Sequence, residues 1–175
     1  MKTYENKEKG VSKMTGQEPD RFFYNNEKFE LVGVKGKGLL VPNDIGIETY
    51  MSATSCRRGY IMRYKIVGSQ LVLDGFWFNS KSDDLPEINS NKPVNLSEEI
   101  AEEGDYFHEM FKFEYRNLEK QIPFKGSIIL GKDLMKSKYV HMGFQSPTAY
   151  KTVLKFEFKN GIMVNVEDQS EETKK

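Results

Sequence analysis

The chain has 175 residues, of which 38% are hydrophobic and 30% are charged, and its formal net charge is zero. This length predicts one domain with a real hydrophobic core. Zero net charge gives no sign of the basic face that nucleic-acid binders carry, and a single cysteine excludes an intramolecular disulfide. We therefore expect no nucleic-acid partner, no cysteine-based zinc site, no metal and no cofactor.

Both ends of the chain are polar and lack hydrophobic periodicity. Residues 1–19 are charged and have no apolar core of the kind found in secretory signal peptides, and residues 167–175 are similar. We expect two flexible tails around a single β-rich domain at 20–166. No apolar run approaches the ~18 residues of a membrane helix, so we expect no membrane contact and a cytoplasmic location.

The domain opens with a predicted β-hairpin. Asn25 and Asn26 tolerate positive φ and separate two apolar runs, at 21–24 and 29–34. The glycines that follow lead into a further predicted strand at Leu39–Val41.

A longer hairpin closes the first half. Gly68 and Ser69 form a hairpin signal between runs at 59–67 and 70–78. Along the first run, apolar and charged side chains alternate, which predicts one buried and one mostly hydrated face. The predicted buried face consists of Tyr60, Met62, Tyr64 and Ile66.

The middle of the chain, residues 81–105, is strongly acidic. It contains eight acidic residues and two lysines, so it is six units negative. We expect a long loop, with a short helix at Ser97–Glu103 that Ser97 caps and Gly104 ends. A run of like charge is usually a solvated surface, and the alternative is a docking segment for a basic protein surface.

The second half again predicts strands and a closing hairpin. Asn160-Gly161, between two alternating runs, is the strongest short hairpin signal because a type I′ turn needs positive φ twice. One or two helical turns are predicted at Lys132–Ser137. The predicted strands are Met110–Tyr115, Gly126–Leu130, Lys151–Phe158 and Gly161–Val166.

The order of these elements is similar in the two halves, at 20–80 and 106–166. Both have a glycine-started apolar run followed by a long closing hairpin, which suggests an internal duplication linked by the acidic segment. Each half is marginal alone, so the two should share one core. We expect a mainly β fold, an antiparallel sheet or barrel-like, with one or two short helices.

Few residues suggest catalysis. His108 and His141 are the only histidines and therefore the natural general bases, and Cys56 is the one thiol nucleophile. Nothing in their spacing brings the three together, and a lone cysteine is more often a small buried hydrophobic residue. Their spacing also matches no metal motif. Enzyme activity is therefore uncertain, and the sequence favours a non-catalytic protein.

A ligand site is suggested by Arg57 and Arg58, which suit an anion, together with Asp74. With His141 they would form a site between the two halves. The alternative, without ligand binding, is a solvated turn whose arginines pair with acidic residues.

A protein interface is suggested by an aromatic cluster and by the acidic segment. One member of the cluster at 76–78 should point outward because alternate strand residues face opposite sides, and Trp77 is the candidate anchor. The acidic candidates for this interface are Glu98, Glu99, Glu102 and Glu103.

Three stretches of the second half, Gly126–Leu130, Tyr139–Phe144 and Lys155–Gly161, resemble small uncharacterised bacterial proteins. The resemblance extends over Phe22–Val166 and implies no activity. Our first functional hypothesis is a non-catalytic intracellular protein-interaction module, of an adaptor or toxin-neutralising type. The alternative is a small-ligand binder or hydrolase whose site lies between the halves. The sequence alone leaves the oligomeric state open.

Overall fold

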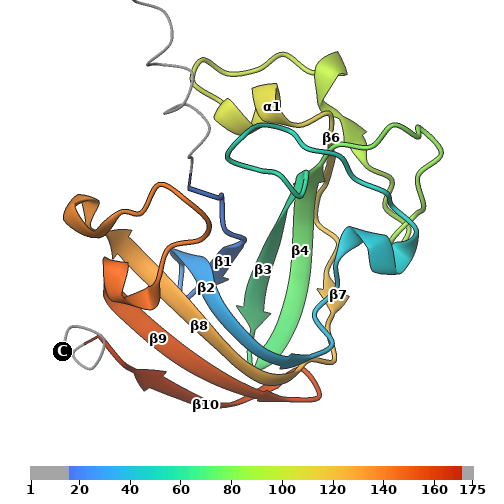
Figure 1. The fold of residues 1–175 in the computed structure, drawn as a ribbon. Coiled ribbons are helices and arrows are strands. Elements are labelled where there is room, and N and C mark those ends of the chain that lie inside the picture. Colours follow the sequence, from blue (N-terminus) through green and yellow to red (C-terminus); the bar gives the residue numbers. More distant parts are fainter. Residues whose placement is uncertain (1–15, 171–175) are drawn as a thin grey trace, which may run out of the picture.

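The protein, seen here in a computed structural model that describes residues 16–170, is built mainly from β-strands (Figure 1). The predicted mainly β class is confirmed. The strands are β1 (Arg21–Tyr24), β2 (Glu27–Lys37), β3 (Tyr60–Val67), β4 (Gln70–Phe78), β5 (Val94–Asn95), β6 (Phe113–Tyr115), β7 (Lys120–Gln121), β8 (Lys125–Leu134), β9 (Tyr150–Lys159) and β10 (Ile162–Asp168). One short helix, α1 (Tyr106–Met110), joins 3-10 turns at Pro42–Ile45, Leu96–Glu98, Lys136–Lys138 and Pro147–Ala149.

The strands form one curved sheet that returns on itself. Its order is β10-β9-β8-β2-β1-β3-β4-β6-β5, and β7 pairs with β4. The ring closes where Ile162 of β10 pairs with Gln70 of β4, and this pair is flanked by backbone hydrogen bonds from Leu71 to Gly161 (2.8 Å) and from Met163 to Ser69 (2.7 Å). The sheet is mixed, because β1 and β3 run parallel while every other pair of these strands is antiparallel.

Three tight turns confirm the predicted hairpins. Asn25 and Asn26 adopt φ of 50° and 62°, and Asn160 and Gly161 adopt 48° and 80°. Asparagine and glycine reach these left-handed conformations at low cost, so the type I′ geometry follows from the sequence. Gly68, with φ of 62°, turns β3 into β4 with positive φ at the first turn residue and not at Ser69.

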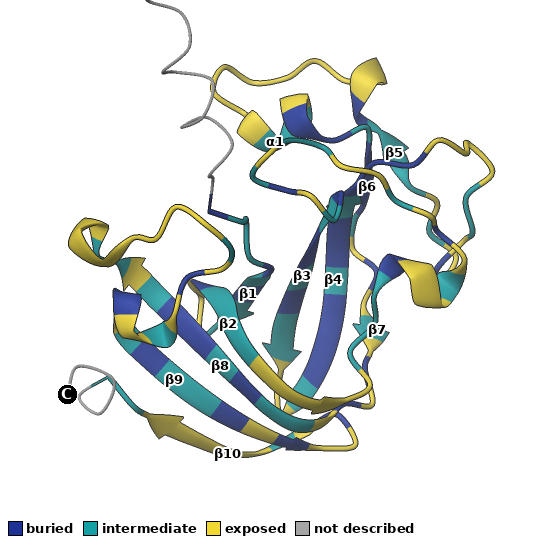
Figure 2. Cartoon of the chain, in the orientation of Figure 1, coloured by how far each residue is buried: buried dark blue, intermediate teal, exposed yellow. Residues whose placement is uncertain are grey.

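The core lies inside the ring and is largely aromatic (Figure 2). The predicted buried face of β3 is confirmed, because Met62 and Tyr64 are buried, and Tyr60 and Ile66 pack against the same core. The opposite face is not mostly hydrated as predicted, because Ile61 is buried in a second hydrophobic cluster with Cys56 and Leu96. Aromatic residues come from several strands and make ring contacts within this interior. They include Phe22, Phe76, Phe78, Tyr115, Phe124, Phe156 and Phe158.

Two predictions about the middle of the chain are wrong. The expected helix at Ser97–Glu103 is only a 3-10 turn at Leu96–Glu98, capped by Asn95. Leu96 is its one buried residue, so a longer helix would have no apolar face to pack. The strand expected at Met110–Tyr115 is shorter, because α1 continues to Met110 and β6 starts only at Phe113.

Two further predictions are corrected near the ends of β2 and β8. Leu39–Val41 is not a strand, because Gly38 (φ 106°) turns the chain and the Leu40 carbonyl accepts a hydrogen bond from Tyr64 Oη (3.1 Å). That side-chain donor replaces the neighbouring strand that a ladder would need. Lys132–Ser137 is not helical over its first half, since β8 continues to Leu134.

The ordered domain extends beyond 20–166 at both ends. The Gln17 amide donates to the Gly143 carbonyl (2.8 Å) and the Glu18 amide to the Ser55 carbonyl (2.7 Å). At the other end β10 continues to Asp168. The rest of the two expected tails, residues 1–15 and 171–175, lies outside the described residues. The internal duplication stays a prediction.

The buried tyrosines predict a loss of stability at alkaline pH. Burial raises the pKa of Tyr64 and Tyr150 above the ordinary value of 10.0, and that of Tyr115 to about 12. Above pH 10 the unfolded chain therefore holds fewer protons than the folded chain, so stability falls as pH rises. We expect the urea-unfolding free energy to decrease steeply from about pH 10 to about pH 11.

The control variant for this prediction is Tyr115→Phe. It loses the hydrogen bond from Tyr115 Oη to the Pro86 carbonyl (2.6 Å), which lowers neutral-pH stability by about 1 kcal/mol. Its stability should nevertheless fall less between these pH values, since one titrating group is gone. An unchanged slope would contradict a contribution from Tyr115.

Candidate functional site

The loops that carry most candidate residues gather at one end of the molecule. In Figure 1, α1, β5 and β6 lie together beyond the upper ends of β3 and β4, with the loops at 46–58 and 79–105 beside them. The opposite end is formed by the β3–β4 and β9–β10 turns. Two features of the upper end are candidates for function, a polar cavity and an acidic loop.

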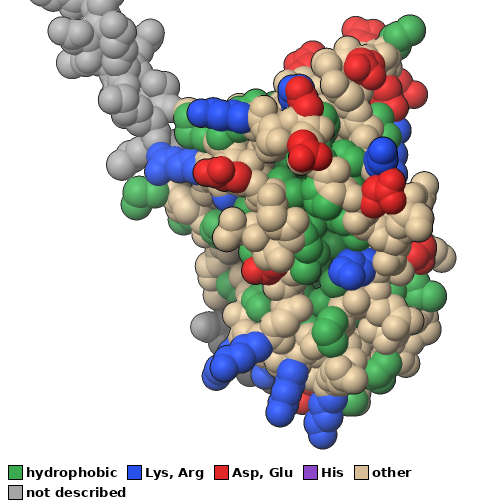
Figure 3. Space-filling view, turned by 90° about the vertical axis from the view of Figure 1, so that its right-hand side faces the viewer, with side chains coloured by type: hydrophobic (Ala, Val, Ile, Leu, Met, Phe, Trp, Pro, Cys, Tyr) green, Lys and Arg blue, Asp and Glu red, His purple; other side chains and the backbone are tan. Residues whose placement is uncertain are grey.

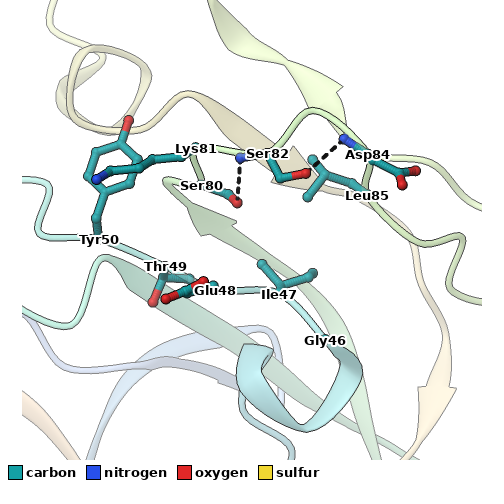
Figure 4. Close-up of a pocket in the computed structure, with 10 residues that line it drawn as sticks. All are labelled: Gly46, Ile47, Glu48, Thr49, Tyr50, Ser80, Lys81, Ser82, Asp84 and Leu85. Carbon is teal, nitrogen blue, oxygen red and sulfur yellow. Dashed lines mark hydrogen bonds between the residues drawn. The ribbon is translucent and has the colours of Figure 1, made fainter.

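The polar cavity, here called the mouth cavity, has a volume of about 500 Å³. One wall is Gly46–Tyr50 and the other is Ser80–Leu85, without Asp83 (Figure 4). The walls are joined where Thr49 bridges to Ser80. The second wall is held by its own serines, because Ser80 Oγ accepts from the Ser82 amide (3.3 Å) and Ser82 Oγ from the Asp84 amide (3.2 Å).

The mouth cavity offers hydroxyl groups and mixed charge, without a catalytic pair. Its ionisable residues are Glu48, Tyr50, Lys81 and Asp84, and no histidine or cysteine of the described chain lines it. The hydrogen bonds recorded for the hydroxyls of Thr49, Ser80 and Ser82 are to backbone groups and not to a side-chain base. A hydroxyl needs such a base to act as a nucleophile, so these walls suit hydrogen bonding to a polar molecule better than covalent chemistry.

Arg58, which we predicted to bind an anionic ligand, forms an ion pair with Asp20 instead. Its guanidinium donates to Asp20 at 2.6 Å and 3.3 Å and to the Glu18 carbonyl at 3.3 Å. Asp20 also accepts from the Met62 amide at 2.7 Å, so one carboxylate ties the start of β1 to β3. Arg58 therefore has a structural role here.

The other predicted ligand residues lie in separate networks. Asp74, on β4, accepts from Arg63 Nε at 3.0 Å and lies 3.2 Å from Lys65 Nζ. Arg57 is exposed, and its amide donates to Gln17 Oε1 (3.0 Å). None of these residues lines the mouth cavity, and neither does His141. The predicted ligand set does not form that site.

Within the described residues, the catalytic candidates make no hydrogen bond with one another. Cys56 is 2% exposed, its Sγ donates to the Tyr60 carbonyl (3.5 Å), and burial raises the pKa of the thiol. A raised pKa disfavours the thiolate that a nucleophile needs. His141 is exposed and packs edge-on against Tyr139. His108 Nε2 is buried and has no hydrogen-bond partner among the described residues.

The described residues also lack an evident metal site, since no group of three or more His, Cys, Asp or Glu side chains is placed to hold an ion.

Trp77 points away from the core, as strand alternation predicts, but other side chains cover it. The centre of the Phe107 ring, on α1, lies 4.7 Å from the centre of the Trp77 ring. The guanidinium of Arg63, on β3, lies 4.5 Å from the centre of the same Trp77 ring. Trp77 therefore packs against α1 and is less available as an anchor for a partner protein. The sequence could not show this, because its pattern did not predict α1.

The acidic loop, residues 97–105, is the most exposed part of the upper end. Every residue in it is exposed, and Ile100 is 99% exposed. Glu99 forms an ion pair with Arg116 at 3.0 Å, and hydrogen bonds from Arg116 lower the pKa of its carboxyl. Within the described part of the chain, the acidic loop residues without an ion pair are Glu98, Glu102, Glu103 and Asp105.

Both ends of the acidic loop are anchored. Leu96 is buried before it, and Asp105 caps α1 by accepting from the His108 amide (3.1 Å). Inside the loop, the Asp105 amide donates to the Glu102 carbonyl (3.0 Å), and Gly104 (φ 86°) completes this turn. The sequence identified the glutamates but missed Ile100, although one large aliphatic residue within an acidic run is a visible signal.

A scan against family models, a search of curated proteins and a search of solved structures each found no match. Among the described residues, no helix is both long and apolar enough to cross a membrane. Fold and site together define a mixed, ring-like β-sheet protein that presents an anchored acidic loop and a polar cavity.

Proposed function

We propose that this protein is a non-catalytic interaction module whose acidic loop docks onto a basic surface of another protein. One observation carries the proposal: Ile100, which is 99% exposed, lies in a loop with four acidic side chains that form no ion pair among the described residues. An isolated exposed aliphatic residue is common, but one held in an anchored loop among like charges combines an apolar anchor with steering charges.

The distribution of charge supports the same proposal. On the face drawn in Figure 3, acidic side chains gather mainly toward the upper end, where basic side chains lie among them, and only basic side chains project prominently from the lower end. Exposed lysines of β2, β8 and β9 that form no ion pair within the described residues are Lys28, Lys35, Lys37, Lys125, Lys151 and Lys159. A neutral protein with separated charges can orient a charged partner before contact, so the acidic end would meet a basic surface first.

The ion pairs and ring contacts that hold the two ends of the acidic loop support a docking role. Arg116 binds Glu99 and also Glu114 of β6 (2.8 Å), which connects the loop to the sheet. Phe107, Trp77 and Arg63 stack under α1 at the other end of the loop. A binding loop held in place before contact loses less conformational entropy on binding.

The test is a charge reversal of three loop glutamates, Glu98→Lys, Glu102→Lys and Glu103→Lys, which leaves the Glu99–Arg116 pair intact. Partners captured from a lysate of the source cells by the full chain are identified by mass spectrometry, and their affinities are then measured with purified proteins. We expect affinity to fall about tenfold or more in the reversed variant, and association to slow with added salt. Ile100→Ala should cost a similar factor without salt dependence.

The matched control reverses three exposed glutamates outside the loop, Glu48, Glu157 and Glu167, and changes net charge equally. It should bind as the wild type does. Undiminished capture by the loop variant, or equal losses in both variants, would remove the proposal.

The mouth cavity supports a second candidate, reversible binding of a small polar ligand. Its volume of about 500 Å³ lies within the usual range for ligand sites, and hydroxyls with charges of both signs line it. The hydrolase form of this hypothesis has less support, because Cys56, His108 and His141 are absent from the cavity.

A further inference from the structure

A second, smaller cavity, here called the outer pocket, lies on the outer face of the sheet beside α1. Its volume is about 240 Å³, and it shares no lining residue with the mouth cavity. Four aromatic and three basic residues line it, and none of the lining residues is acidic. This composition favours a ligand that is both flat and negatively charged.

Strand alternation brings the lining of the outer pocket together. Phe22 of β1 is fully buried in the core, so its neighbours Arg21 and Phe23 point to the outer face. Lys28 of β2 lies directly opposite Phe23 in the β1–β2 ladder and therefore on the same face. An aromatic side chain on this outer face needs a cover, which α1 supplies only in part.

Two arginines lie against the aromatic walls of the outer pocket. The Arg63 guanidinium lies 4.5 Å from the centre of the Trp77 ring, and that of Arg21 lies 5.3 Å from the centre of the Phe107 ring. Gly75 leaves space for the first of these, because a Cβ there would come within 2.5 Å of Arg63 Nη2. The walls are therefore held in place without a ligand.

One of the three cations of the outer pocket is uncompensated. Arg63 Nε donates to Asp74 at 3.0 Å and Arg21 Nη2 to Glu18 at 2.7 Å, so both arginines are already paired with carboxylates outside the lining. Lys28 is exposed and forms no ion pair among the described residues. The outer pocket thus offers a ligand one free positive charge.

The acid that could compete for Lys28 is held elsewhere. Glu30 lies two residues along β2, on the same face of the strand. It accepts a hydrogen bond from Tyr150 Oη and lies 4.0 Å from Arg21. Glu30 lines the neighbouring cavity and not the outer pocket, so the charge of Lys28 remains available to a ligand.

We propose that the outer pocket binds a small aromatic monocarboxylate. Its ring would lie among Phe23, Trp77 and Phe107, and its carboxylate would pair with Lys28. A volume of about 240 Å³ is below the usual range for drug-sized ligands, so a molecule with one ring fits best. A phosphate dianion would meet only one uncompensated cation, and an aliphatic acid would not stack on the rings. This site does not depend on docking by the acidic loop.

The reporter for the test is Trp77, the only tryptophan of the chain. In the isotope-labelled full chain its indole N–H gives a single NMR resonance, which the ring of a bound ligand would shift. Benzoate is the probe, and benzamide, which has nearly the same shape but no charge, is its control. We expect benzoate to shift the resonance with a dissociation constant of about 1 mM. Benzamide should bind about fivefold more weakly, because it lacks the charge that pairs with Lys28.

A pair of lysine variants assigns the charge preference. Lys28→Met removes the charge and keeps an apolar stem, and Lys37→Met, also exposed on β2 but outside the lining, is the matched control. Lys28→Met should bind benzoate as weakly as benzamide, and Lys37→Met should keep the preference of the wild type. A Trp77 resonance that stays fixed up to about 20 mM benzoate would overturn the proposal. So would equal affinities of the wild type for the two probes, or a benzoate preference that survives in Lys28→Met.

Discussion

Replacing Asp20 with alanine is expected to lower the free energy of unfolding by about 4 kcal/mol, among the largest effects available to a single substitution in this chain. Asp20 is 9% exposed and accepts from Arg58 and from the Met62 amide. Its removal leaves a largely buried guanidinium without its carboxylate and a buried N–H without an acceptor. Each orphaned group then bears its full desolvation cost.

Urea unfolding followed by circular dichroism measures this loss. Asp20→Asn keeps an acceptor for the Met62 amide but no charge for Arg58. Its free energy of unfolding should therefore lie between those of the wild type and Asp20→Ala. Asp84→Ala is the control, because Asp84 is exposed and forms no ion pair among the described residues, and its effect should stay within about 0.5 kcal/mol. A loss below about 1 kcal/mol for Asp20→Ala would show that the Arg58–Asp20 pair contributes little.

Gly59→Ala is expected to destabilise the protein by about 3 kcal/mol or more, through a steric clash at the upper end. Gly59 has φ of 77°, and a Cβ there would lie 1.9 Å from the Tyr50 carbonyl oxygen. The clash involves backbone, which cannot rotate away as a side chain would. The Gly59 carbonyl also accepts a hydrogen bond from the backbone amide of Asn79 (3.0 Å). Tyr50 belongs to one wall of the mouth cavity and Asn79 directly precedes the other, so a displacement of Gly59 would disturb both walls.

Gly46→Ala provides a close control for this substitution. Gly46 has nearly the same φ, 78°, but a Cβ there would meet nothing within 4 Å. Both alanines bear the cost of a left-handed conformation, about 1 kcal/mol, and only Gly59→Ala adds the clash. The difference between the unfolding free energies of the two variants measures the cost of the close approach between a Cβ at position 59 and the Tyr50 carbonyl. Equal losses in the two variants would mean that this loop relaxes freely.

The parts of the fold that the sequence predicted are those in which neighbouring residues decide the outcome. Asn25-Asn26, Gly68-Ser69 and Asn160-Gly161 each specify a turn, because these residues accept positive φ. The alternation in β3 specified which side chains enter the core. Where the sequence failed, at α1 and at Leu39–Val41, distant partners replaced the local preference, namely the cluster beneath Met110 and the Tyr64 hydroxyl.

The candidate site was only partly predictable. The acidic residues of the loop were identified by composition, because a charged run must remain at the surface. The isolation of Ile100 and the pairing of Glu99 with Arg116 depend on where β6 places the partner side chains. The predicted grouping of His141, Arg58 and Asp74 does not line the mouth cavity, since residues far apart in the chain meet only as the strand order dictates.

The sequence by itself determined that this chain forms β-hairpins around an aromatic interior and presents an acidic loop, because turn geometry, strand alternation and charge solvation act over a few residues. Only the tertiary structure decided that β1 pairs in parallel with β3 and that the ring closes at Ile162. Those features depend on pairing between strands far apart in sequence, where hydrogen bonding and burial must together outweigh the entropy lost in closing long loops.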